Sequence, residues 1–258
     1  KQGPCIENEF SDYAEIDQRY AREWLLAMCA SGYISHTESV SKFYMSEEQK
    51  AVFSFEDSSA FMLGAFDILS GNIHNIDKVK DAFKTGEGIN YESTHPCIFS
   101  GTARFFRPSY SSNLLKKWIP AIPNVEKKLK KGCNFADIGC GFGVSSIMIA
   151  QAFQNSKVFG FDIHKPSIET AIKEAKKKNL NNAQFKVADA ENYNGKFDII
   201  TFFDCLHDMG DPLGASKYAF NHLNNTGTLI LIEPFASDLP EDNFNTVGQM
   251  YYSFSTMG

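Results

Sequence analysis

From about residue 131 onward, short apolar segments of the sequence alternate with segments of helical periodicity. The expected strands cover residues 135–138, 157–162, 184–187, 197–203 and 227–233, and the expected helices cover residues 144–153, 166–179 and 213–223. Strands that alternate with helices at this spacing are typical of a parallel sheet, because parallel strands need helical crossovers. The sequence therefore predicts a doubly wound α/β domain in this part of the chain.

The part of the chain before residue 131 is expected to be mostly helical. Tyr20, Trp24 and Met28 share one face of a helix over residues 17–28, and two short segments, 32–35 and 42–45, follow it across a polar loop. A helix followed by such a hairpin indicates a winged-helix module. Further helices are expected over residues 58–69, 79–83 and 111–119, and a loop over residues 85–96.

Charge and cysteine content restrict the function classes. The 258 residues have a formal net charge of −6, and residues 1–60 carry 5 Lys and Arg against 11 Asp and Glu. Since phosphate backbones are bound by clustered basic side chains, this balance argues against nucleic-acid binding by the N-terminal module. The sequence has no apolar run long enough for a membrane span, no apolar leader segment, and six scattered Cys without a Cys-x-x-Cys pair. We therefore expect a reducing, cytoplasmic setting, with no membrane association and no metal site.

A glycine-rich segment, Asp137-Ile138-Gly139-Cys140-Gly141-Phe142-Gly143, lies between an expected strand and an expected helix. Glycines there permit a tight turn and the close approach of a ligand, while the N–H groups that begin the helix favour polar or anionic ligand groups. Asp162 ends the next strand, where a carboxylate can accept hydrogen bonds from a ribose diol. The spacing differs from the Gly-x-Gly-x-x-Gly of dinucleotide sites, which disfavours an NAD-dependent oxidoreductase. The pattern indicates a nucleoside site.

The glycine turn, Asp162, Asp189-Ala190 and the segment 197–203 together resemble the motifs of the class I S-adenosylmethionine-dependent methyltransferases. This resemblance covers residues 133–235 and implies a Rossmann-like sheet with S-adenosyl-L-methionine as cofactor. It implies that Asp137 and the glycines hold the methionine end, that Asp162 holds the ribose, and that Asp189 and Ala190 flank the adenine. The implied cofactor-binding residues are Asp137, Gly139, Cys140, Gly141, Phe142, Gly143, Asp162, Ile163, Asp189, Ala190 and Asp204.

A narrower resemblance covers nearly the whole chain. Segments 20–25, 101–108, 203–212 and 233–236 are similar to those of a family of small-molecule methyltransferases with an N-terminal winged helix. In the wider class of O-methyltransferases with such a domain, the winged helix serves dimerisation and roofs the substrate pocket. The resemblance therefore implies a homodimer through this module and methyl transfer to a small, hydrophobic or aromatic acceptor, with O-methylation favoured over N-methylation.

Asp204, His207 and Asp208 follow a strand at the carboxyl edge of the expected sheet, where open α/β sheets bind ligands. His207 and Asp208 are the candidate catalytic residues. Imidazole can take a hydroxyl proton near neutral pH, and Asp208 or Asp204 can orient it. Alternatively, His207 packs against the cofactor or caps the following helix. A catalytic base is not obligatory for methyl transfer, since proximity and alignment of the reacting groups can supply most of the rate.

The candidate substrate residues are Arg104, Phe106 and Tyr251. Arg104, together with Arg107, can clamp an acidic substrate or form structural ion pairs. Tyr251 can line a pocket or pack in the core.

These observations predict three parts: a winged-helix-like module over residues 1–57, a helical connector and pocket lid over residues 58–130, and a methyltransferase domain over residues 131–258. Both ends are expected to be incomplete, since the module lacks its opening helix and the 25 residues after Glu233 are too few for a helix and two strands. The alternative function is a winged-helix transcription regulator that senses a ligand through a degenerate methyltransferase domain.

Overall fold

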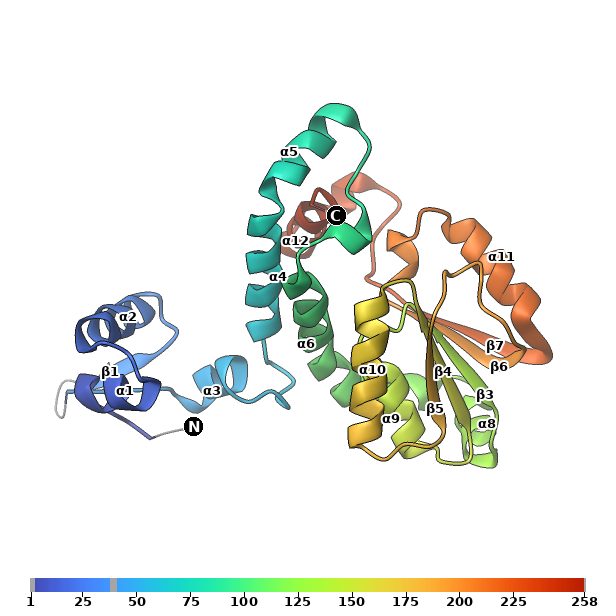
Figure 1. Cartoon of the computed structure of the whole chain (residues 1–258), viewed down its shortest axis with the longest axis horizontal. Coiled ribbons are helices and arrows are strands. Elements are labelled where there is room, and N and C mark those ends of the chain that lie inside the picture. The colour runs from blue at the N-terminus through green and yellow to red at the C-terminus, as the bar shows by residue number, and fades with distance from the viewer. Residues whose placement is uncertain (1–2, 38–40, 258) are drawn as a thin grey trace. The chain divides into compact units, whose positions relative to one another are not determined.

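The structure, a computed structural model, describes residues 3–37 and 41–257 (Figure 1). It divides into two compact units, Lys1–Leu63 and Gly64–Gly258, and each is described by itself. The division into parts at residues 57/58 and 130/131 stays a prediction.

The first unit combines helices with a small hairpin: α1 (Glu7–Ala14), α2 (Gln18–Ala30), β1 (Ser35–Thr37), β2 (Lys42–Tyr44) and α3 (Glu47–Phe53). The carboxylate of Asp17 begins α2 by accepting hydrogen bonds from the N–H groups of Arg19 and Tyr20. The buried residues of α2 are Ala21 and Leu25, whereas Tyr20 is 71% exposed. The inner face of the helix is therefore offset by one residue from the face that carries Tyr20 and Trp24.

The strand expected over residues 32–35 is wrong, because those residues mostly close the end of α2. The N–H groups of Tyr33 and Ile34 both donate to the carbonyl of Met28, and Gly32 has a left-handed φ of 75°. The first strand of the antiparallel wing is instead Ser35–Thr37. Residues 38–40 of the expected loop lie outside the described residues.

The second unit begins with helical segments: α4 (Leu63–His74), α5 (Ile76–Thr85), η1 (Tyr91–Ser93), α6 (Pro96–Asn113), the π-helical η2 (Leu114–Trp118), α7 (Ile119–Ala121) and α8 (Val125–Lys131). The expectations of a helix starting at residue 58 and of another confined to residues 111–119 are wrong. α6 starts much earlier because Pro96 suits a first helical turn, and His95 accepts a hydrogen bond from the N–H of Cys97.

Glycines let α4 and α6 approach closely. A Cβ atom on Gly64 would lie 2.4 Å from the backbone N of Phe105, and one on Gly101 would lie 2.8 Å from the backbone N of Ile68. No side chain fits at either position without a shift of the backbone, so the close packing of α4 against α6 depends on these two glycines.

The central sheet is parallel throughout and has the strand order β5-β4-β3-β6-β7. Its strands are β3 (Asn134–Ile138), β4 (Lys157–Asp162), β5 (Ala183–Val187), β6 (Phe197–Phe203) and β7 (Leu223–Ile232). The chain runs from β3 outward to β5 and then returns to β6 on the other side of β3. This reversal is a topological switch point at the carboxyl ends of β3 and β6, the place where such sheets bind ligands.

Helices cover both faces of the sheet, as Figure 1 shows. They are α9 (Val144–Ala152) and α10 (Lys165–Lys177) on one face and α11 (Pro212–His222) on the other. Residues of β6 alternate between the two cores: Ile199 packs with Ile149 of α9, whereas Ile200 packs with Ala215 of α11. The predicted doubly wound α/β fold is confirmed.

After β6 and β7 come short helical segments: η3 (Leu206–Asp208), η4 (Pro240–Asn243) and α12 (Thr246–Ser255). The sequence does not predict α12. Within the described part of the chain, no helix is long and apolar enough to cross a membrane.

Candidate functional site

The glycine turn lies between β3 and α9, at the switch point of the sheet. Gly139, Gly141 and Gly143 have left-handed φ values of 71°, 51° and 74°, which only glycine adopts readily. A Cβ atom on Gly139 would lie 2.7 Å from Sγ of Cys205, so this glycine brings the turn against the loop after β6. A Cβ atom on Gly141 would meet nothing within 4 Å. The turn therefore leaves room above Gly141 for a ligand.

Asp162 connects the turn to the end of β4. Its carboxylate accepts hydrogen bonds from the N–H groups of Gly141 at 2.7 Å and His164 at 2.8 Å. The side chain is buried, and burial raises its pKa against these two hydrogen bonds. Ile163 beside it is 45% exposed and offers apolar surface. A carboxylate next to an exposed apolar side chain suits a ribose and its base, so these residues fit a nucleoside.

The other residues expected around the adenine follow β5. The N–H of Ala188 donates to the carbonyl of Asp162 at 3.0 Å, which brings Asp189 and Ala190 to the same edge of the sheet as Asp162. Asp189 is exposed and accepts a hydrogen bond from the N–H of Glu191 at 2.9 Å. The structure therefore brings together the residues that were assigned to the ribose and the adenine.

Asp137 lies in the core between β3 and α9 and is only 1% exposed. Ser145 and Ser146 each donate to its Oδ2 at 2.6 Å, and Thr201 donates to its Oδ1 at 3.0 Å. Burial raises the pKa of this carboxyl, although the three hydroxyl groups oppose the shift. Asp137 thus joins β3, β6 and α9, and its assignment to the methionine end stays a prediction.

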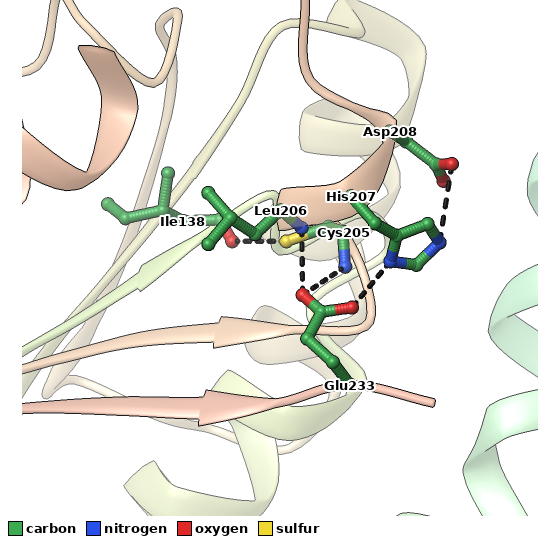
Figure 2. A network of polar contacts seen from close by, with 6 residues as sticks. All are labelled: Ile138, Cys205, Leu206, His207, Asp208 and Glu233. Atoms are coloured by element: carbon green, nitrogen blue, oxygen red, sulfur yellow. Dashed lines mark hydrogen bonds and ion pairs between the residues drawn. The ribbon is translucent and has the colours of Figure 1, made fainter. Parts of the chain in front are cut away.

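His207 is held by Glu233, which follows β7 (Figure 2). Nδ1 of His207 lies 2.5 Å from Oε2 of Glu233, while Oε1 of Glu233 accepts hydrogen bonds from the N–H groups of Cys205 and Leu206 at 3.3 and 2.9 Å. Nε2 of His207 lies 3.3 Å from Oδ1 of Asp208. Both Glu233 oxygens therefore fix the loop that carries the imidazole.

The charges around His207 determine its proton affinity. Partial burial alone would lower the pKa of the imidazole, but the hydrogen bond that His207 donates to Glu233 and the charges of Asp208, Glu233 and Asp204 outweigh burial and raise the pKa above its ordinary value. With Nδ1–H directed at Glu233, the neutral imidazole presents an unprotonated Nε2. The ring is about half exposed and can reach a ligand.

Asp204 directly follows β6 and has a left-handed φ of 57°, which is uncommon for a residue with a side chain. Its N–H donates to the carbonyl of Ile232 at 2.7 Å. Burial raises the pKa of its carboxyl to about 6, and the negative charges of Glu233 and Asp208 add to the shift while His207 opposes it. Strained backbone and a displaced pKa are both common at functional sites.

Asp204, His207 and Glu233 offer ligand atoms that all lie within 4.8 Å of one another, so that the group has the composition of a metal site. However, Nδ1 of His207 and Oε2 of Glu233 already share a hydrogen bond. We therefore interpret the pair as a hydrogen-bonded dyad.

Tyrosines from two other segments approach this group. The hydroxyl of Tyr110 on α6 is buried close to the carboxylates of Asp137, Asp204 and Glu233, and burial and these charges raise its pKa. Tyr251 on α12 feels the charge of Asp204, and burial followed by that charge raises its pKa. Of the predicted substrate residues, Tyr251 thus lies near the site.

The other predicted substrate residues have other partners. Arg104 donates to Asp67 of α4 at 3.0 Å, which is the structural ion pair considered above. Arg107 is exposed and acts on Glu174 of α10. Phe106 packs against the core and lies 6.3 Å, centroid to centroid, from Tyr110.

Two residues of this site were missed as site residues. Glu233 directly follows β7, the strand adjacent to β6, so its place at the same sheet edge was a usable signal. Tyr110 could not be placed, because α6 was not expected to start before residue 111.

Comparison with known proteins identifies related domains and shared folds. A family model described as a methyltransferase domain matches residues 129–255, and a model described as an Rv2258c-like winged HTH domain matches residues 2–54. The tRNA U34 carboxymethyltransferase of Campylobacter lari is 27% identical over 157 residues, which cover 57% of this chain and 50% of that protein. The chain spans about half the length of the curated relatives it matches.

Solved structures share the fold over almost the whole chain. An O-methyltransferase family protein from Burkholderia thailandensis superposes with a TM-score of 0.71 at 12% identity, covering 99% of this chain and 77% of that one. The mitomycin 7-O-methyltransferase superposes with a TM-score of 0.66 at 12% identity, covering 97% and 75%.

Proposed function

We propose that this chain, which belongs to the class I S-adenosylmethionine-dependent methyltransferases and carries an N-terminal winged helix-turn-helix domain, methylates a hydroxyl group of a small molecule. The observation that carries the proposal is the His207–Glu233 dyad, which lies at the carboxyl edge of the sheet beside the glycine turn.

The cofactor would lie over Gly141, with its ribose at Asp162 and its adenine near Ile163, Asp189 and Ala190. We further assign Asp137 and the rest of the turn, Gly139, Cys140, Phe142 and Gly143, to the support of its methionine end. When bound, S-adenosylmethionine supplies an electrophilic methyl group on a sulfonium.

His207 acts as the general base. Its Nε2 would take the proton of the acceptor hydroxyl, whose oxygen would receive the methyl group that the bound cofactor supplies. Glu233 keeps Nδ1–H in place and stabilises the imidazolium that results. Asp208, whose Oδ1 lies 3.3 Å from Nε2, adds a negative charge that stabilises the imidazolium once Nε2 carries the proton. This role of His207 is the reason that O-methylation is preferred to N-methylation in the proposal.

The setting of the protein is also part of the proposal. All six Cys are free thiols, which supports a reducing cytoplasm. The excess of acidic residues before residue 61 supports a role for the winged unit in dimerisation, without nucleic acid as a partner.

Transfer of a labelled methyl group from S-adenosylmethionine to a panel of small phenols and alcohols tests the proposal. We expect labelled ether products with the wild-type chain and loss of labelling in His207→Gln. Labelling of duplex DNA or of protein instead of the small molecules would contradict the proposed substrate class.

A further inference from the structure

The acceptor side of the site has an excess of carboxylates. Oδ1 of Asp208 lies 3.3 Å from Nε2 of His207, and Oε2 of Glu233 lies 2.5 Å from its Nδ1. A carboxylate oxygen of Asp204 lies within 4.8 Å of the ligand atoms of His207 and Glu233. The charged groups that act on Asp204 are His207, Glu233 and Asp208. Three carboxylates against one imidazole leave this part of the site negative, whichever protonation state His207 adopts.

The tyrosines that face the same group add no positive charge. The ring of Tyr110 lies 5.9 Å, centroid to centroid, from that of Phe203, the residue before Asp204. The negative charges of Asp137, Asp204 and Glu233 act on the Tyr110 hydroxyl, and the charge of Asp204 acts on Tyr251. Within the described part of the chain, no Lys or Arg is among the groups that act on Asp204, Asp208, Tyr110 or Tyr251. Phenol rings beside carboxylates are the surroundings in which proteins hold organic cations.

The arginines that could have balanced this charge are engaged elsewhere. Arg104 pairs with Asp67 on α4, and Arg107 acts on Glu174 on α10. A carboxylate or phosphate on the acceptor would therefore meet like charges without a basic partner, which is costly in a partly buried site.

The cofactor does not remove this excess. The ammonium and carboxylate of its methionine end offset each other, and its sulfonium loses its charge when the methyl group leaves. Three carboxylates therefore still exceed the positive charges of one sulfonium and one imidazolium.

We infer that the acceptor site selects a hydroxylated aromatic molecule that also bears a protonated amine, with Asp204 as the residue that holds the ammonium. This inference rests on the proposed methyl transfer. Asp204 was assigned above to the cofactor, but its neighbours Tyr110, Tyr251 and Glu233 are groups of the acceptor side. Asp204 therefore selects which acceptor binds, whereas His207 remains the general base.

Three phenols of nearly equal shape test the inference: tyramine with an ammonium, tyrosol with a neutral hydroxyl, and para-hydroxyphenylacetate with a carboxylate. Each is titrated calorimetrically into the full chain saturated with S-adenosylhomocysteine. We expect tyramine to bind about tenfold more tightly or better than para-hydroxyphenylacetate, with tyrosol between them.

Asp204→Asn removes the negative charge of the side chain but keeps its shape, and Asn tolerates the left-handed backbone at this position. We expect this variant to lose most of the preference for tyramine while its affinity for S-adenosylhomocysteine stays the same. Asp77→Asn, which removes an exposed carboxylate from α5, is the matched control and should keep the preference.

Equal binding of the three phenols, including no binding by any of them, would overturn the inference, and so would an Asp204→Asn variant that retains the preference. Weaker S-adenosylhomocysteine binding in Asp204→Asn would return Asp204 to the cofactor and likewise overturn it. If S-adenosylhomocysteine does not bind the wild-type chain in the first titration, the proposed function fails and the inference with it.

Discussion

Nδ1 of His207 lies 2.5 Å from Oε2 of Glu233, although 26 residues separate them in the sequence. The pair connects the loop after β6 to the end of β7, and both strands end at the same edge of the sheet. A histidine fixed at one nitrogen and accessible at the other has the arrangement of a general base.

Replacing His207 should therefore affect catalysis more than binding. We expect His207→Gln to lower kcat by about a hundredfold to ten-thousandfold, the usual contribution of a general base. The affinity for S-adenosylhomocysteine, measured by calorimetry, should change little. Unchanged kcat would mean that His207 only packs against the cofactor or caps a helix.

The pH dependence of kcat should report the surroundings of His207. The imidazole must be neutral to accept a proton, so the rate should rise with pH through the pKa of His207, which lies above its ordinary value. Glu233 is one of the groups that raise the pKa of His207, so Glu233→Gln should move the midpoint of the kcat–pH profile to lower pH. A midpoint that does not move, or moves upward, would contradict the dyad.

Asp162 should matter most for cofactor affinity. Removing its hydrogen bonds to the ribose in Asp162→Ala should weaken S-adenosylhomocysteine binding by about 1.5–3 kcal/mol, or roughly tenfold to a hundredfold in Kd. The exposed Asp238→Ala serves as the control and should bind as the wild type does. Equal affinities in the two variants would place the ribose elsewhere.

Asp137 should affect stability first. In Asp137→Ala, the hydroxyls of Ser145, Ser146 and Thr201 lose their common acceptor inside the core. We expect the free energy of unfolding in urea to fall by about 2–4 kcal/mol. Full stability combined with lost S-adenosylhomocysteine binding would instead favour direct contact between Asp137 and the cofactor.

The sequence predicts the sheet well because its strands are short apolar segments bounded by polar or glycine-rich turns. The bounds of β4 and β6 agree with the structure at both ends. The helical part is predicted less well: α6 contains Pro108 and starts in a segment rich in turn-forming residues, so local composition conceals it. Residues that meet only through that helix, such as Tyr110 and Asp204, could not be paired from the sequence.

The site shows the same limit. The glycine turn and Asp162 are visible because they are close to their strands in sequence. The partner of His207 was expected to be Asp208 or Asp204, its neighbours along the chain, whereas Glu233 makes the short hydrogen bond. Sheet order brings Glu233 there, and sequence spacing carries no such information.

Chelation tests the interpretation of this group as a dyad. Since the His207 and Glu233 atoms already share a hydrogen bond, treatment with EDTA should leave methyl transfer unchanged. Loss of activity that is restored by Mg²⁺ or Mn²⁺ would show that Asp204, His207 and Glu233 hold a metal ion.

The most direct test of the account is a calorimetric titration of the whole chain with S-adenosylhomocysteine. The open space over Gly141, beside Asp162, predicts saturable binding in the micromolar range at one site per chain. Absence of binding would contradict the assignment of this space to the cofactor and, with it, the proposed methyl transfer.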